Sequence, residues 1–300
     1  MTDAIDVLVP TCDRPAALAV TLTSLLGQTL RPARVVVSDQ GELLPAAEAG
    51  EVVAVVRALR HHGVDVTLTR HLPKRGLAEQ RQFLLDQAEA AYALYLDDDV
   101  VCAPTLLARL HTGMTRARCG FVGSAVIGLS YLDDVRPHEQ RFERWDGPVR
   151  PERVAPGTPE WERHRLHNAA NLAHVARDLG LTDGDVVLYK VAWIGGCVLY
   201  DVAKLRAVGG FGFWTSLPPG HCGEDVVAQQ RVIAEYGGAG LLPSGAYHQE
   251  LPTTVVDRSV DAPHLLADGW AGSRGGYRER SWVGRARSEG GGNGHGHDAS

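Results

Sequence analysis

Short apolar runs alternate with amphipathic segments along the first half of the chain. The runs that predict strands lie at residues 5–9, 34–37, 64–69, 91–96 and 121–127. Between them apolar residues recur at helical spacing; Leu18, Leu22 and Leu25, for example, stand at i, i+4 and i+7. Because strands that alternate with helices pair in parallel, the pattern predicts an α/β fold. In that fold a doubly wound, mainly parallel sheet carries helices on both faces.

The pattern weakens in the second half of the chain. From Tyr131 to Asp185 the periodicity fades and Arg, His, Glu and Pro become frequent, so we expect an irregular insertion that confers specificity rather than sheet core. Regular patterning returns at residues 186–200, in a helix over 202–208 and in a helix that begins near Glu224. The residues of 281–300 are too polar to pack, and they predict a disordered tail.

Acidic residues follow several of the predicted strands. Asp13 and Asp39 follow the first two strands, and three consecutive carboxylates, Asp97, Asp98 and Asp99, follow the fourth. Open α/β sheets bind ligands at the carboxyl ends of their strands, so these side chains are expected to share one rim. Adjacent like charges need compensation. Water in a surface turn would supply it, and so would a divalent cation with oxygen ligands, so both alternatives stay open.

Two further candidate sites lie near the end of the regular pattern. Glu224 and Asp225 open a predicted helix, where acids commonly cap free N–H groups, although a carboxylate in this position also suits a general base. His248 ends a short apolar run. A single His is usually a hydrogen-bonded structural residue, but an imidazole could also add a ligand to a metal held by carboxylates. The residues alone leave both alternatives open.

Composition and missing motifs exclude several classes of protein. The net charge of −6 gives no general attraction to nucleic acid. No GxGxxG or GxxxxGK(S/T) follows a predicted strand, which argues against Rossmann dehydrogenases and P-loop enzymes. The five cysteines are scattered without a CxxC pair, as in proteins of a reducing compartment. No signal peptide or transmembrane segment is visible, so the cytoplasm is the expected location.

Four sequence blocks carry a family resemblance. In chain order they are VLVPTCDRPAALAVTLTSLLGQ (7–28), VVVSDQG (35–41), LYLDDD (94–99) and WIGGC…VGGF…GEDVVAQQRVIAEYG (193–237), with His248 beyond. On these blocks the chain resembles the family 2 glycosyltransferases of the GT-A fold from Ile5 to His248. LYLDDD fits that family's DxD motif, and Asp13 stands where Asn is commoner.

The resemblance implies a role for each candidate residue. Residues 1–128 would be the nucleotide-sugar-binding half and residues 129–280 the acceptor-binding, catalytic half of one GT-A domain. The implied donor-binding residues are Thr11, Asp13, Arg14, Asp39, Asp97, Asp98 and Arg75. Arg81 would join Arg75 at the diphosphate, unless either is solvated or forms a structural pair. Trp193 would form the floor of the sugar or acceptor site, or pack in the core. Asp99 and His248 would bind Mn²⁺ or Mg²⁺, and Asp225 would be the catalytic base with Glu224 in support.

The implied reaction is metal-dependent, inverting transfer of a sugar from a nucleoside-diphosphate sugar, preferably a UDP-sugar, to an unidentified acceptor hydroxyl. A single base without a second carboxylate nucleophile favours one displacement. A nucleotidyltransferase would instead release pyrophosphate, and it usually has a glycine-rich loop that Thr11–Pro15 lacks. A non-catalytic nucleotide-sugar-binding module is the third alternative, against which the joint presence of Asp99, Asp225 and His248 argues.

Overall fold

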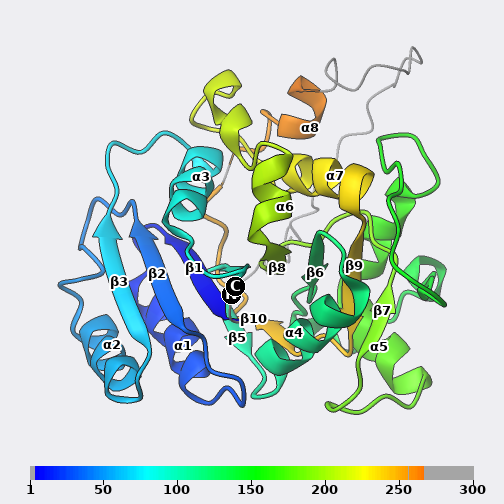
Figure 1. The fold of residues 1–300 in the computed structure, drawn as a ribbon, viewed down its shortest axis with the longest axis horizontal. Helices are drawn as coiled ribbons and strands as arrows, with labels where there is room; N and C mark the ends of the chain where they lie inside the picture. The colour runs from blue at the N-terminus through cyan, green and yellow to red at the C-terminus, as the bar shows by residue number, and fades with distance from the viewer. Residues whose placement is uncertain (1–3, 256, 267–300) are drawn as a thin grey trace, which may run out of the picture. The chain divides into compact units, whose positions relative to one another are not determined.

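The computed structural model describes residues 4–255 and 257–266 of the chain, so the tail predicted at 281–300 lies outside the described residues. Within them the central element is an eight-stranded sheet. Its strands are β1 (Ile5–Thr11), β2 (Arg34–Asp39), β3 (Asp65–Arg70), β4 (Tyr92–Leu96), β6 (Phe121–Gly123), β7 (Val187–Tyr189), β8 (Cys197–Asp201) and β9 (Gly238–Leu242). Their order across the sheet is β3-β2-β1-β4-β8-β6-β9-β7 (Figure 1). Parallel pairs join β1 to β2 and β4, β2 to β3 and β6 to β9, whereas β8 is antiparallel to both its neighbours and β7 to β9.

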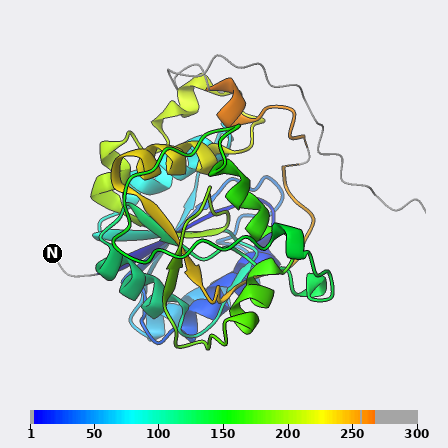
Figure 2. The same ribbon diagram turned by 90° about the vertical axis from the view of Figure 1, so that its right-hand side faces the viewer.

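Helices cover both faces of this sheet. In chain order they are α1 (Pro15–Leu26), α2 (Gly50–His61), α3 (Leu77–Gln87), α4 (Leu106–Ala117), α5 (Asn171–Asp178), α6 (Val202–Ala207), α7 (Glu224–Tyr236) and α8 (Ala262–Leu265). α1, α2 and α4 lie on one face and α3, α6 and α7 on the other (Figures 1 and 2). Leu8 of β1 packs in the core on the α3 side, while Val7 and Val9 pack on the α1 side, as the two-residue period of a strand requires. The predicted doubly wound, mainly parallel sheet with helices on both faces is confirmed.

A two-stranded sheet forms beside the acidic triplet. β5 (Val100–Cys102) and β10 (Ala246–His248) pair antiparallel, with His248 opposite Val100. β5 begins directly after Asp99, so this pairing brings His248 next to the triplet. The Thr21 hydroxyl of α1 fixes the turn between β4 and β5, because it donates to the Asp98 carbonyl (2.8 Å) and accepts the Val100 N–H (3.2 Å).

The strand predicted at residues 121–127 is shorter in the structure and ends at Gly123. The next residue, Ser124, is fully buried, and its hydroxyl donates to the Ser244 carbonyl at 2.5 Å. This bond ties the Ser124 side chain to the segment that precedes β10. The segment after Gly123 therefore turns away from β8 toward β10, where Ile127 forms an isolated bridge with Tyr247.

The region expected to be irregular, 131–185, is only partly so. It contains the 3₁₀ helices η2 (Pro137–Glu139) and η3 (Trp161–His167), with η1 (Leu129–Tyr131) overlapping its start, and the α-helix α5 was not predicted. Leu172, Val175 and Ala176 of α5 are buried in the core at i, i+3 and i+4. This helix has only eight residues, which left too short a periodic signal against the surrounding polar sequence. Part of the region therefore belongs to the core, contrary to expectation.

The sheet contains strands from both predicted halves of the chain. β8, from the predicted acceptor-binding half, lies between β4 and β6 of the predicted nucleotide-sugar half. The two predicted halves thus share one sheet, and the boundary at residue 128 stays a prediction.

Among residues 4–255 and 257–266, every helix is too short or too polar to cross a bilayer.

Candidate functional site

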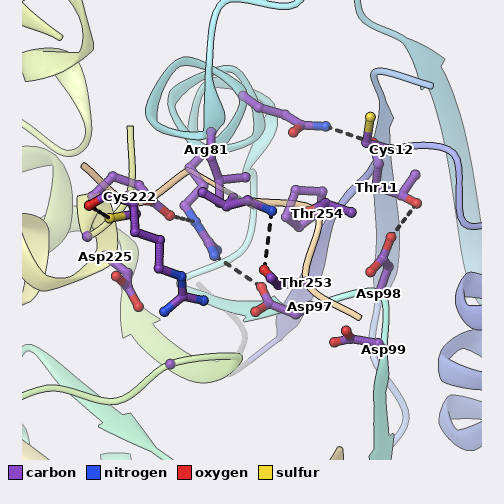
Figure 3. A pocket seen from close by; sticks show the side chains of 18 of the residues that line it. Thr11, Cys12, Arg81, Asp97, Asp98, Asp99, Cys222, Asp225, Thr253 and Thr254 are labelled. Carbon is purple, nitrogen blue, oxygen red and sulfur yellow. Dashed lines mark hydrogen bonds and ion pairs between the residues drawn. The ribbon is translucent and has the colours of Figure 1, made fainter. Parts of the chain in front are cut away.

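A cavity of about 530 Å³ opens at the carboxyl ends of β1 and β4 (Figure 3). The predicted site residues in its lining are Thr11, Arg14, Arg81, Asp97, Asp98, Asp99, Trp193, Glu224, Asp225 and His248. They come from the end of β1 and the residue before α1, from α3, from the turn after β4, from the segment between β7 and β8, from the start of α7 and from the end of β10. Asp13, Asp39 and Arg75 are not among the lining residues.

The acidic triplet is largely buried, and each carboxylate has a different partner. Asp97 is the most exposed of the three and accepts a hydrogen bond from Nη2 of Arg81 at 3.0 Å. Asp98 is 7% exposed and accepts one from the Thr11 hydroxyl at 2.6 Å, while Asp99 is 8% exposed and pairs with Nη1 of Arg14 at 2.7 Å. Asp98 and Asp99 are thus too deeply buried for a surface turn in which water compensates the charges.

The arrangement of the triplet disfavours the ionised form of the Asp98 carboxyl. Burial raises the pKa of Asp98 to about 7; the hydrogen bond from Thr11 opposes the shift, and the charges of Asp99 and Asp97 add to it. Arg14 lies 3.6 Å from Asp98 and also donates to the carbonyl of Pro252. The site therefore holds more negative charge than its neighbouring cations neutralise, which favours binding of a further cation.

Asp99 and His248 are the residues that a divalent cation would meet. Among the described residues, no three His, Cys, Asp or Glu side chains are placed together to hold a metal ion. Oδ2 of Asp99 nevertheless lies 3.5 Å from Nε2 of His248, and two adjacent ligands of an octahedral Mg²⁺ are about 3 Å apart. Because Mg²⁺ is usually held by one or two protein groups together with substrate phosphates, the pair fits such an ion.

The hydrogen bonding of His248 favours Asp99 as the stronger ligand of the two. Nδ1 of His248 accepts the N–H of Glu250 at 2.6 Å, which places the proton of the neutral ring on Nε2, facing Asp99. Nε2 can bind a metal only when it has lost that proton. Glu250 adopts a left-handed backbone conformation, with a φ of +57°, in the exposed segment that follows β10.

Asp225 stands at the start of α7 and is partly buried in the cavity wall. Its Oδ1 accepts the N–H of Val226 at 2.8 Å, and among the described residues it has no ion-pair partner. Burial raises the pKa of Asp225 to about 7; the Glu224 carboxylate adds to the shift and Arg81 opposes it. A carboxyl group with a pKa near neutrality is suited to accept a proton from a substrate hydroxyl.

Arg81 connects the two acidic elements of the site. Its Nε donates to Oε1 of Glu224 at 2.9 Å, and its Nη2 bonds to Asp97 on the other side. The charges of Asp97 and Glu224 raise the pKa of the guanidinium, against the effect of its burial. Glu224 is only 2% exposed and is held by this pair, so it contacts Arg81 rather than standing free in the cavity. Diphosphate binding and structural pairing were both considered for Arg81, and the structure shows it paired with Asp97 and Glu224.

The predicted donor-binding residues outside the cavity organise a neighbouring loop. Oδ1 of Asp13 accepts the N–H groups of Glu42 and Leu43, both at 2.8 Å. Asp39 accepts the N–H groups of Gly41 (2.7 Å) and Ala46 (2.8 Å). Both carboxylates thus hold the loop that follows β2. Arg75 is exposed in the segment before α3.

The sequence interpretation missed the segment after His248, which contributes to the cavity wall. Leu251, Thr253, Thr254, Val255, Arg258 and Asp261 line the cavity. Arg258 has no carboxylate partner among the described residues, in contrast to Arg14 and Arg81. The segment is polar and lacks periodicity, so the sequence carried no signal for its position.

One comparison with known proteins identifies a family, and another identifies the fold. A family model described as "Glycosyl transferase family 2" matches residues 6–170. The crystal structure of S. aureus TarS is similar over 82% of this chain and 36% of that chain, with 15% identity and a TM-score of 0.50. At this identity the likeness shows the fold alone, and it confirms the predicted GT-A fold. No curated protein matches the sequence.

Two further solved structures are similar at lower scores. TarS in complex with UDP-GlcNAc matches over 83% of this chain and 59% of that chain, with 15% identity and a TM-score of 0.49. The mannosyltransferase PcManGT from Pyrobaculum calidifontis, in complex with GDP-Man and Mn²⁺, matches over 84% and 58% respectively, with 16% identity and a TM-score of 0.49. This chain therefore spans only part of the length of these proteins.

Proposed function

The chain belongs to glycosyl transferase family 2, and on this premise we propose that it is a metal-dependent inverting glycosyltransferase with Asp225 as its general base. The observation that carries the proposal is the position of Asp225 in the cavity wall, close to the acidic triplet, where it is partly buried and has no counter-ion within residues 4–255 and 257–266. The donor would be a nucleoside-diphosphate sugar, with a UDP-sugar as the first candidate, and the acceptor a hydroxyl compound.

Five free cysteines suit a reducing compartment, and we propose the cytoplasm as the location.

Asp225 would act on the acceptor hydroxyl. As the acceptor oxygen forms its bond to the anomeric carbon, its proton passes to the Asp225 carboxylate. The bond from that carbon to the phosphate oxygen breaks, and its electron pair leaves with the nucleoside diphosphate. One displacement inverts the anomeric centre. Glu224 would support the base by holding Arg81, which keeps the guanidinium from pairing with Asp225.

The donor diphosphate would face two guanidinium groups. Arg14 and Arg258 both line the cavity, and Arg258 has no other anionic partner among the described residues. Thr11 and Asp97 would contact the nucleoside side, while Asp13 and Asp39 would shape the loop against which the base rests. Arg75, exposed and outside the lining, would act only if its segment moved toward the donor.

Asp99 and His248 would hold a divalent cation, Mn²⁺ or Mg²⁺. A bound cation of this kind stabilises the negative charge that builds up on the leaving phosphate oxygens. The negative charge of the triplet supports this assignment, because Asp98 and Asp99 are buried with a single arginine between them. Asp98, bonded to Thr11, would fix the position of β1 beside the site rather than bind the ion itself.

Chelation should lower turnover at least tenfold, and added Mn²⁺ or Mg²⁺ should restore it. Asp99→Ala should lower turnover by a similar factor that added metal does not restore, because the oxygen ligand is gone. The loss should stay moderate, since Arg14 is freed from Asp99 and can still face the diphosphate. Turnover that survives both chelation and the Asp99 variant would contradict the metal assignment.

The pH dependence should report the Asp225 carboxyl. The base acts in its ionised form, so kcat/KM should rise with pH through about 7 and level off above 8. At pH 5, two units below that pKa, only about 1% of the carboxyl is ionised, which predicts a roughly hundredfold lower rate. Thermal unfolding measured at both pH values controls for loss of folded protein. A flat profile from pH 5 to 8 would contradict the assignment.

Product analysis tests the reaction class itself. The enzyme is incubated with UDP-, GDP-, dTDP- and ADP-sugars and Mn²⁺, and the released nucleotide is identified. Glycosyl transfer releases a nucleoside diphosphate from these donors. A nucleotidyltransferase leaves them intact and releases pyrophosphate only from a nucleoside triphosphate and a sugar 1-phosphate, which are supplied in a parallel incubation. A binding module without activity would shift the thermal unfolding of the protein with a donor and release neither.

A further inference from the structure

A second cavity, of about 350 Å³, adjoins the first. The two cavities share Asp97, Asp99, Trp193, Gly195 and His248 in their linings. The second is completed by residues that the first does not contact, among them Val126 beyond β6, His164 and His167 of η3, and Asn168. The region at 131–185, which was expected to confer specificity, therefore contributes one wall of this cavity.

The proposed base stands at the boundary between the cavities. Gly195 lines both, and a Cβ at this residue would lie 3.7 Å from Oδ2 of Asp225. At Gly196, φ is +79° and a Cβ would approach Cγ2 of Val126 to 2.7 Å, so only glycine fits. Gly195 thus places Oδ2 of Asp225 beside the part of the lining that the two cavities share. A molecule in the second cavity can therefore present a hydroxyl to Asp225 while the donor occupies the first.

The charge of the second cavity restricts what it can hold. Its described lining contains the carboxylates of Asp97 and Asp99 and no lysine or arginine. Desolvation lowers the pKa of His167 to about 4, with His164 adding to the shift, so the His167 ring is neutral near pH 7. The divalent cation proposed at Asp99 and His248 would face the donor diphosphate, so an anionic acceptor would meet two carboxylates and no lysine or arginine to pair with. The cavity is therefore unfavourable for phosphate and carboxylate groups.

The same cavity offers an aromatic surface and neutral hydrogen-bonding atoms. The His164 ring stacks on Trp193, with centroids 4.9 Å apart and planes 11° apart, and Trp161 packs on the same indole at 4.6 Å. Nδ1 of His164 bonds to the Trp161 carbonyl at 2.8 Å, which leaves Nε2 as an acceptor without a partner among the described residues. Asn168 uses its N–H₂ group on Glu139, so its carbonyl oxygen also stays available.

We propose that this second cavity is the acceptor site and that it takes a neutral, hydroxyl-bearing ring: a sugar residue without phosphate or carboxylate groups. The proposal rests on the glycosyl transfer proposed above. Sugar hydroxyls can donate to Nε2 of His164 and to the Asn168 oxygen, and the C–H face of a pyranose can pack on the edge of the aromatic cluster formed by Trp161, His164 and Trp193. Neither an anion nor a purely apolar molecule satisfies all of these groups.

The first stage of the test separates this proposal from the proposed function. The full chain is incubated with UDP-glucose, UDP-GlcNAc, GDP-mannose and dTDP-glucose in the presence of Mn²⁺ and without acceptor. Release of nucleoside diphosphate by transfer to water supports glycosyl transfer. If no donor is hydrolysed and none stabilises the protein against thermal unfolding, the proposed function and the acceptor assignment both fail.

The second stage adds three neutral probes and one anionic probe, of which the glucoside and the glucuronide differ only in the group at C6. 4-Nitrophenyl β-D-glucoside, -galactoside and -xyloside are compared with 4-nitrophenyl β-D-glucuronide. At least one neutral probe should raise nucleoside diphosphate release tenfold or more over hydrolysis, and the glucuronide should be at least tenfold less effective than the glucoside. If no neutral probe accelerates release, or if the glucuronide equals the glucoside, the acceptor assignment is overturned while glycosyl transfer stands.

Substitutions of residues that line only the second cavity test whether the probes bind there. His164→Phe keeps a ring on Trp193 but removes Nε2, and Val126→Phe fills the space beside Gly196. For each, the ratio of probe-dependent release to hydrolysis should fall at least fivefold. Arg165→Ala is the matched control, because Arg165 lies on the same 3₁₀ helix with an exposed side chain paired to Glu162, and its ratio should stay unchanged. If the two variants behave like the control, the site is elsewhere.

Discussion

Replacing Asp225 with Asn should lower the turnover number by roughly 10²–10⁴, the usual contribution of a general base. The Asn side chain keeps the size of the carboxyl and can still accept the N–H of Val226, so the start of α7 should be preserved. It cannot take the acceptor proton, because an amide oxygen is far too weak a base. Removing the charge also relieves its repulsion with Glu224, so the variant should be at least as stable as the parent above pH 7.

Glu235→Gln is the matched control for this prediction. It makes the same chemical change in the last turn of α7, where the side chain is exposed, and it should leave turnover within twofold. Donor affinity should change only a few fold in Asp225→Asn, because the proposed donor contacts lie with Arg14 and Arg258. If the Asn variant turns over like the parent, Asp225 is not the base. If donor binding is lost with activity, the residue serves the donor instead.

The layered fold could be predicted because each of its elements carries a local signal. Val7, Leu8 and Val9 are buried on alternate faces of the sheet, so β1 reads as a continuous apolar run, and α1 shows a buried stripe against it. The insertion of β8 between β4 and β6 carries no such signal. The pairing of Cys197 with Leu96 joins residues far apart in sequence, and only the complete packing of the chain selects it.

In the candidate site, too, some features have a local signal in the sequence and others depend on how the whole chain packs. Asp97, Asp98, Asp99 and Asp225 could be proposed because they belong to ordered family blocks at predictable ends of strands and helices. The partner of each carboxylate could not be proposed. Whether Arg81 meets a phosphate or two carboxylates depends on the approach of α3 to α7, which no local pattern encodes. The wall formed by η3 escaped prediction for the same reason.

Replacing Arg81 with Met should destabilise the protein by about 3–5 kcal/mol, because it leaves the buried Glu224 carboxylate without its cation. The Glu224 side chain is 3% exposed and cannot recover water, whereas the Asp97 side chain is 37% exposed and can be hydrated. Most of the cost should therefore arise at Glu224. Arg81→Lys should fall between Met and the parent, because one ammonium group cannot span both carboxylates as the guanidinium fork does.

A second substitution separates charge from packing. If the cost arises from the unpaired charge of Glu224, Arg81→Met combined with Glu224→Gln should regain a large part of the lost stability in urea unfolding, since the side chain at residue 224 then carries no charge. Arg165→Met removes one partner of the exposed pair with Glu162 and should cost less than about 1 kcal/mol, which calibrates an ordinary surface pair. A loss of stability in Arg81→Met that Glu224→Gln does not reduce would place the cost in lost packing, against Tyr95 for example. Arg81 would then support the site by its volume, and the charge bridge between α3, α7 and the triplet would be incidental.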